Sequence, residues 1–109
     1  MKKTLILLLL MCSTSVFANE WLYVSGNELL NRLKDGGDRD SLFYISGVVD
    51  SISILEPYDR EICIEKGTSL QQLGQLTYNH MLKHPEKWML SGSYFVITML
   101  RETYPCKKQ

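Results

Sequence analysis

The sequence predicts a small all-α domain, a single bundle of about four helices with one disulfide bond. Apolar residues recur at steps of three and four in four separate segments, which is the spacing of a buried helix face. Gly and Pro stand at the ends of these segments, and two cysteines flank the last two of them. A chain of 109 residues suits one domain and leaves no room for a second.

The first 18 residues have the pattern of a secretory signal peptide. Lys2 and Lys3 form a short basic region, and an apolar run over residues 4–11 follows it. Val16 and Ala18 place small residues at both positions that a signal peptidase reads. We therefore expect residues 1–18 to be removed and residues 19–109 to form the mature domain. The apolar run is too short to remain as a membrane anchor.

Cys12 raises an alternative, because a lipid-modified cysteine would also follow an apolar run. Met11 stands before it, at a position where lipidation normally requires a small residue. This disfavours the alternative.

The charge of residues 19–109 disfavours nucleic acid as a partner and gives no sign of a disordered tail. Ten basic and twelve acidic side chains remain after loss of the two lysines. Because basic residues are not in excess, nothing suggests nucleic-acid binding, and because like charges do not cluster, nothing suggests a disordered tail.

Two cysteines remain as well, Cys63 and Cys106. In an oxidising compartment such a pair is by default a structural disulfide. Export and a disulfide together indicate the bacterial periplasm or beyond.

A first short helix is expected to begin at Ser25. Ser25 suits the N-cap position, and Glu28 three residues later completes a capping box. Three leucines follow at helical spacing, and Gly36-Gly37 ends the helix.

A second helix is expected after Asp38 or Asp40, since either can cap it. Its apolar positions are Leu42, Ile45, Val48, Val49, Ile52 and Leu55. The β-branched residues among them favour a strand weakly, but they do not alternate with period two. We expect Gly47, in the middle, to allow close approach of a neighbouring helix. Pro57 ends the segment.

Residues 56–66 are expected to form a charged, exposed loop. Tyr58 stands there among Asp59, Arg60 and Glu61, and an aromatic residue among charges suits a protein interface. The alternative, in which Tyr58 folds back onto the core, stays open because loops both vary freely and host binding sites.

Thr68 is expected to cap a third helix, with Gln71 as its capping-box partner. The expected buried stripe consists of Leu70, Leu73, Leu76, Thr77, His80 and Met81. The expected outer face consists of Gln71, Gln72, Gln75, Asn79 and Lys83. A fourth helix is expected from Pro85, which suits the first helical position, until Pro105. Its inner face would hold Trp88, Gly92, Phe95, Val96, Met99 and Thr103.

The sequence offers no convincing catalytic or metal site. His80 and His84 lie four positions apart, but no third ligand has suitable spacing and no Glu lies between them to act as a base. We interpret His80 as a residue at the edge of the core and His84 as exposed. The bonded cysteines offer no thiolate, and the acids of residues 50–65 are not held at a defined separation. We predict no enzyme activity, no metal and no cofactor.

Four stretches have the order and spacing of a known family. They are residues 44–50 (YISGVVD), 63–73 (CIEKGTSLQQL), 84–86 (HPE) and 104–106 (YPC). Together they resemble the Rap/Tai family, the periplasmic immunity proteins against type VI secretion amidase effectors. The chain departs from the family pattern at Glu65, where Pro is usual, and at Gly92-Ser93, where an Ala-rich stretch is common.

The resemblance implies an all-α immunity domain over residues 19–109, secretion to the periplasm and frequent homodimers. It also implies a non-catalytic role, in which the protein blocks the active-site groove of a secreted peptidoglycan amidase effector delivered by a competing cell. Nucleic acid is not an expected partner, and neither is a membrane once the signal peptide is removed.

Contacts with this partner are expected on residues 56–61 and on the polar face of the third helix. Tyr58 and Arg60 are residue types that dominate binding energies at interfaces, while Gln71 and Gln75 offer hydrogen bonds. A different class of function is a small helical periplasmic chaperone that opens in acid. It would favour a larger excess of acids than twelve over ten bases.

Overall fold

The computed structural model describes residues 24–107. The predicted signal peptide and its cleavage site lie outside the described residues. The elements, in chain order, are α2 (Gly26–Leu33), η2 (Lys34–Gly36), α3 (Arg39–Ile52), α4 (Tyr58–Glu61), α5 (Leu70–Leu82), η3 (Pro85–Lys87) and α6 (Gly92–Thr103). This part of the chain contains two isolated β-bridges and no strand. The prediction of a small all-α domain of about four main helices is confirmed.

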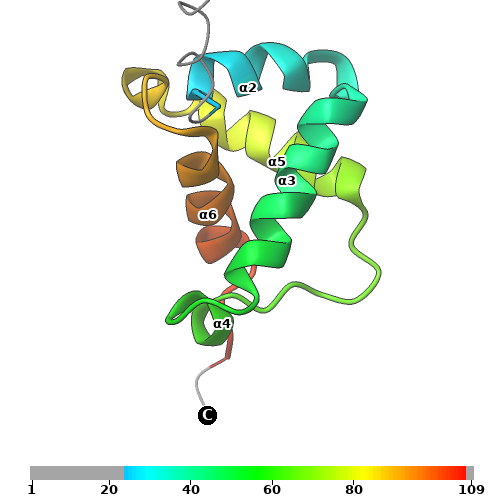
Figure 1. Ribbon diagram of the computed structural model, residues 1–109, viewed down its shortest axis with the longest axis vertical. Helices are drawn as coiled ribbons and strands as arrows, with labels where there is room; N and C mark the ends of the chain where they lie inside the picture. The colour runs from blue at the N-terminus through cyan, green and yellow to red at the C-terminus, as the bar shows by residue number, and fades with distance from the viewer. Residues whose placement is uncertain (1–23, 108–109) are drawn as a thin grey trace, which may run out of the picture.

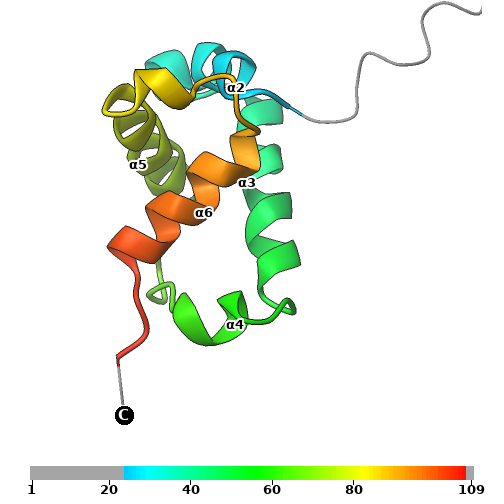
Figure 2. The same cartoon turned by 90° about the vertical axis from the view of Figure 1, so that its left-hand side faces the viewer.

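The four longer helices form one bundle (Figures 1 and 2). α2 lies across one end, α3 and α6 run away from it, and α5 crosses behind them. Each of these helices packs against the other three. The short α4 lies at the opposite end from α2, below α3 and α6.

The core is built from the apolar stripes that the sequence predicts. Its fully or almost fully buried apolar side chains are Leu29, Leu30, Leu33, Ile45, Ile52, Leu73, Met81, Phe95, Val96, Met99 and Leu100. Because they come from α2, α3, α5 and α6 alike, their burial removes one apolar face of every main helix from water.

Ser25 and Asp38 cap their helices as expected, but the capping box predicted with Glu28 is not formed, because the Glu28 carboxylate accepts from Arg32 instead. Ser25 caps α2 by accepting a hydrogen bond from the Glu28 N–H, and Asp38 caps α3 by accepting one from the Ser41 N–H at 2.7 Å. Gly36 and Gly37 have φ values of 92° and 83°, which favour glycine, and they separate the two helices.

The prediction for the start of α5 is wrong by one residue. Ser69, not Thr68, is the N-cap, and its capping-box partner is Gln72 rather than Gln71. The reason is a turn at Gly67, which has φ 87°. The Thr68 hydroxyl donates to the Glu65 carbonyl across this turn and is not available to the helix.

The prediction that the fourth helix begins at Pro85 is wrong. Pro85–Lys87 forms one 3₁₀ turn, and α6 begins at Gly92. The carbonyls of Trp88 and Leu90 accept hydrogen bonds from N–H groups at the start of α2, at 2.9 and 2.7 Å. These acceptors satisfy N–H groups that a helix start leaves free, which explains why residues 88–91 are not helical.

Three expected packing positions of α3 and α6 are also corrected. A Cβ at Gly47 would have no neighbour within 4 Å, so no helix approaches there. The close approaches occur instead at Gly26 and Gly74. Leu55 lies beyond the end of α3 and is 49% exposed, and Thr103, expected on the inner face, is exposed.

Candidate functional site

The end of the molecule that carries α4 is fastened by the Cys63–Cys106 disulfide. The two Cα atoms lie 4.9 Å apart, so the predicted bond is confirmed. Two backbone hydrogen bonds run beside it, from Cys63 to the Tyr104 carbonyl at 2.8 Å and from Cys106 to the Glu61 carbonyl at 3.0 Å. The disulfide therefore joins the segment after α4 to the segment after α6. We call this region, residues 53–64 and 101–107, the α4 end.

Residues 58–61 form a turn of helix, where the sequence suggested an irregular loop. The N–H groups of Arg60 and Glu61 donate to the Pro57 carbonyl, and that of Ile62 donates to the Tyr58 carbonyl at 3.0 Å. Pro57 fits this place because it lacks an N–H that would need a partner.

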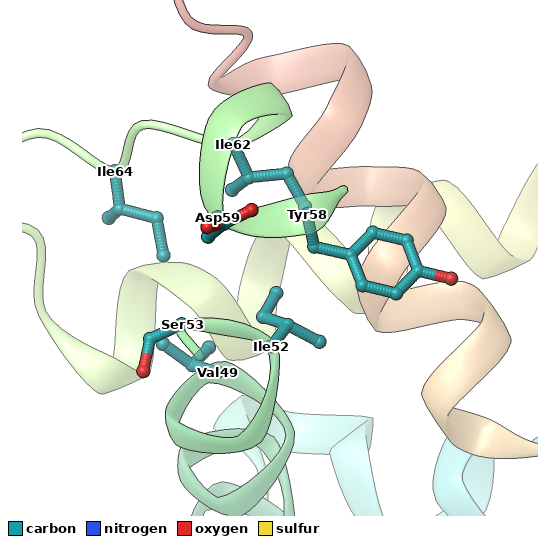
Figure 3. Close-up of a pocket in the computed structure, with 7 residues that line it drawn as sticks. All are labelled: Val49, Ile52, Ser53, Tyr58, Asp59, Ile62 and Ile64. Atoms are coloured by element: carbon teal, nitrogen blue, oxygen red, sulfur yellow. The ribbon is translucent and has the colours of Figure 1, made fainter. Parts of the chain in front are cut away.

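The Tyr58 side chain is half-buried and contacts the edge of the core. Its ring projects from α4 toward α6 (Figure 3), where the Arg101 guanidinium carbon lies 4.8 Å from the ring centroid. Tyr58 therefore folds back onto the edge of the core and stays partly accessible, while its role at an interface stays a prediction. Arg60, in contrast, is exposed, and its Nη2 lies 2.9 Å from Oε1 of the exposed Glu56.

Two hollows meet at Tyr58. The first, of about 230 Å³, is lined by Val49, Ile52, Ser53, Tyr58, Asp59, Ile62 and Ile64 (Figure 3). The second, of about 450 Å³, is lined by Tyr44, Gly47, Val48, Ser51, Ile52, Leu55, Tyr58, Ser93 and Ile97. Both are lined mainly by apolar side chains, with hydroxyl groups in each and the Asp59 carboxylate in the first.

The outer face of α5 is the second surface that the sequence singles out. Gln71 and Gln75 are exposed as expected, and Gln75 donates to the Asn79 side chain at 2.9 Å. The views in Figures 1 and 2 both separate α5 from α4. The four expected contact residues therefore form two patches, with Tyr58 and Arg60 in one and the glutamines in the other.

His80 has a structural environment. It is 7% exposed, and its Nε2 lies 2.9 Å from the Thr98 hydroxyl, which itself donates to the Tyr94 carbonyl. The other ring nitrogen, Nδ1, lies 3.4 Å from a Glu102 oxygen. Burial lowers the pKa of His80, and the Glu102 carboxylate partly offsets this.

His84 lies beside His80, with ring centroids 5.0 Å apart, and is partly exposed. Among residues 24–107, no group of three His, Cys, Asp or Glu side chains could hold a metal ion. Within the same range, no helix has the length and hydrophobicity needed to cross a membrane.

Sequence reasoning missed the contribution of α6 to the α4 end. Ser93, Ile97 and Arg101 are spaced four apart, so they share one face of α6. Two of them line the larger hollow, and Arg101 contacts α4. The repeat of four was visible in the sequence, but nothing there showed that this face meets α4.

Comparison with known families assigns the chain. The family model of the Rap1a immunity proteins matches residues 20–106, which include every described helix and both bonded cysteines. Comparisons with curated proteins and with solved structures gave no match. The match confirms the resemblance derived from the four sequence stretches. The chain therefore belongs to the Rap1a immunity proteins, a family whose partners are toxins.

Proposed function

We propose that this protein acts in the periplasm, where it binds and blocks a peptidoglycan amidase toxin delivered by type VI secretion. The observation that carries the proposal is the family match over residues 20–106. The signal-peptide pattern of residues 1–18 and the Cys63–Cys106 disulfide support export, because disulfides persist in oxidising compartments. The amidase as target comes from the resemblance to the Rap/Tai family.

Inhibition by occlusion agrees with the chemistry of the described residues. Among residues 24–107 no group of three His, Cys, Asp or Glu side chains could hold a metal ion, and two largely apolar hollows meet at the Tyr58 ring. Tyr58 is already packed on one side, so binding would immobilise little additional side-chain freedom. Arg60 can exchange its exposed partner Glu56 for an acidic group of the toxin, because exposed ion pairs are weak.

The toxin-binding surface is proposed to comprise Tyr58 and Arg60, with Gln71 and Gln75 as a second patch. A toxin would contact both patches only if it reaches from α4 to the outer face of α5, which Figures 1 and 2 place apart. The α4 end is therefore the primary surface in this proposal.

Co-purification with the product of the neighbouring gene tests the partner, and calorimetry tests the surface. Replacing Tyr58 and Arg60 by Ala should weaken binding to that amidase about 30-fold or more per hot spot. The melting temperature should fall only slightly, because Tyr58 is half-buried at the edge of the core. Arg39 and Phe43 offer a matched control, since they are another exposed Arg and aromatic pair, 5.6 Å apart. Unaltered affinity in the first double variant would place the interface elsewhere.

A further inference from the structure

α4 is too short to keep its shape alone. It comprises four residues, Tyr58–Glu61, and no side chain caps its start. A single helical turn does not offset the entropy that its formation costs. The conformation of α4 therefore depends on the parts of the protein that hold it.

The backbone is held mainly on the C-terminal side of α4. The disulfide, the hydrogen bond from Cys106 to Glu61 and the bridge between Ile62 and Pro105 all act on residues 61–63. None of them acts on the Tyr58 ring, which projects from the other end of the turn.

Arg101 of α6 restrains the Tyr58 ring in addition to its contact with the edge of the core. Its Nε and Nη2 lie 2.9 and 2.8 Å from Oε2 of Glu61, and its guanidinium stacks over the Tyr58 ring at 4.8 Å. One planar guanidinium can make both contacts at once, as a lysine ammonium cannot. Within residues 24–107, this is the only side-chain hydrogen bond that reaches α4 from another helix.

We infer that Arg101 is a positioning residue of the toxin-binding surface, holding Tyr58 and the α4 turn in the binding conformation before the toxin arrives. Its effect on binding rests on the proposed function, while its effect on α4 does not. The Arg101 and Glu61 side chains are each 44% exposed, and an ion pair so exposed contributes little to global stability. It can still shift the local equilibrium of a single turn, and a toxin that must first order that turn binds more weakly.

Hydrogen exchange in the free protein tests the effect on α4. Arg101→Met removes the charge and the hydrogen bonds but keeps an unbranched side chain that suits a helix. We expect the Ile62 amide, which donates to Tyr58, to exchange about tenfold faster, while core amides of α5 and the melting temperature stay unchanged.

Two further variants complete this experiment. Arg101→Lys keeps the charge alone and should restore only part of the protection. Arg39→Met removes an arginine stacked over Phe43, far along the chain, and should leave α4 unchanged. Equal exchange at Ile62 in wild type and Arg101→Met would overturn the inference.

Binding measurements distinguish a positioning role of Arg101 from direct contact between Arg101 and the toxin. Calorimetry with the amidase encoded beside the gene should show about tenfold weaker binding for Arg101→Met. Combining it with Tyr58→Ala and Arg60→Ala should weaken binding no further than those two changes alone, because Arg101 acts through the contact residues of α4. Losses that multiply would show that Arg101 contacts the toxin itself and would overturn the positioning role. If the wild type does not bind the amidase, the proposed function fails, and the exchange experiment still decides the role of Arg101.

Discussion

At the scale of single residues, Gly26 shows how little space some backbone positions leave. A Cβ there would lie 2.6 Å from the Phe95 ring and 2.7 Å from the Trp88 carbonyl oxygen. That carbonyl already accepts a hydrogen bond from the Asn27 N–H, so it cannot move freely. Gly47 is the opposite case, a helical glycine at which an added Cβ would point into open space.

These contacts predict opposite effects for the same substitution. Gly26→Ala should destabilise the fold by about 1–3 kcal/mol, the range for overpacking. Gly47→Ala should stabilise it by up to about 1 kcal/mol, because Ala is the better helix former. Urea denaturation of both variants measures the difference, and a stability loss in Gly47→Ala larger than that in Gly26→Ala would contradict the packing described.

Sequence reasoning assigned the close approach to the wrong glycine. Both residues stand in or near helices, and periodicity does not show which one meets another element. That depends on the antiparallel meeting of the start of α2 with residues 88–92, which lie more than 60 positions away.

His80 predicts a loss of stability in mild acid. Its pKa is lowered in the folded protein, chiefly by burial, from an ordinary value of 6.5. Glu102 opposes this shift, while His84, Lys83 and Lys87 add to it. Below pH 6.5 the unfolded chain therefore takes up the proton first, so the free energy of unfolding falls as pH falls toward the folded pKa.

Denaturation curves between pH 7 and 5 check this prediction. His80→Gln should flatten the dependence on pH, whereas His84→Gln, the same change at a more exposed neighbour, should keep most of it. A wild-type protein that becomes more stable as the pH falls from 7 to 5 would show that the Glu102 contact has a larger effect on the pKa of His80 than burial has.

At the scale of elements, the start of α5 depends on two neighbouring hydroxyls. The Ser69 hydroxyl accepts from the Gln72 N–H, and the Gln72 side chain accepts from the Ser69 N–H. Ser69→Ala should therefore cost about 1 kcal/mol, the usual loss for an N-cap. Thr68→Ala should cost less, since it removes one turn hydrogen bond. Chemical denaturation compares the two, and a larger loss for Thr68 would restore it as the cap.

The sequence predicts these elements better than their ends. The apolar stripe of a helix follows from the spacing of apolar residues along the sequence. This spacing therefore predicts α2, α3 and α5 and disfavours a strand at α3. Thr68 and Ser69 are both good caps, and only the turn at Gly67 decides between them. Pro85 is a suitable first helical residue, but the carbonyls that follow are engaged by α2, and α6 begins at Gly92.

At the scale of the whole molecule, the disulfide closes a loop over a sequence separation of 43 residues. The chain-entropy estimate for such a loop is about 4 kcal/mol. Replacing Cys63 and Cys106 by Ala should lower the melting temperature by about 4–8 °C for each kcal/mol lost. Reduced wild type should melt like the double variant. Equal melting of oxidised and reduced protein would show that the bond contributes nothing.

The candidate site could be predicted only in part, for a reason that belongs to this scale. Tyr58 and Arg60 were found because their residue types stand out within one stretch of sequence. Arg101 and Ile97 were missed because they reach the site from α6, and only the folded chain brings α6 to α4. Local patterns show which residues suit an interface but not which distant segments complete it.

The most direct test of the account is inhibition itself. Peptidoglycan cleavage by the proposed amidase partner should be measured while this protein is titrated in. The account predicts that cleavage falls in proportion to added protein and stops at a fixed stoichiometric ratio, with Tyr58→Ala and Arg60→Ala together shifting the curve to higher concentration. Undiminished cleavage at a large excess would contradict it, and so would equal binding to an unrelated unfolded protein, which is the behaviour of a chaperone.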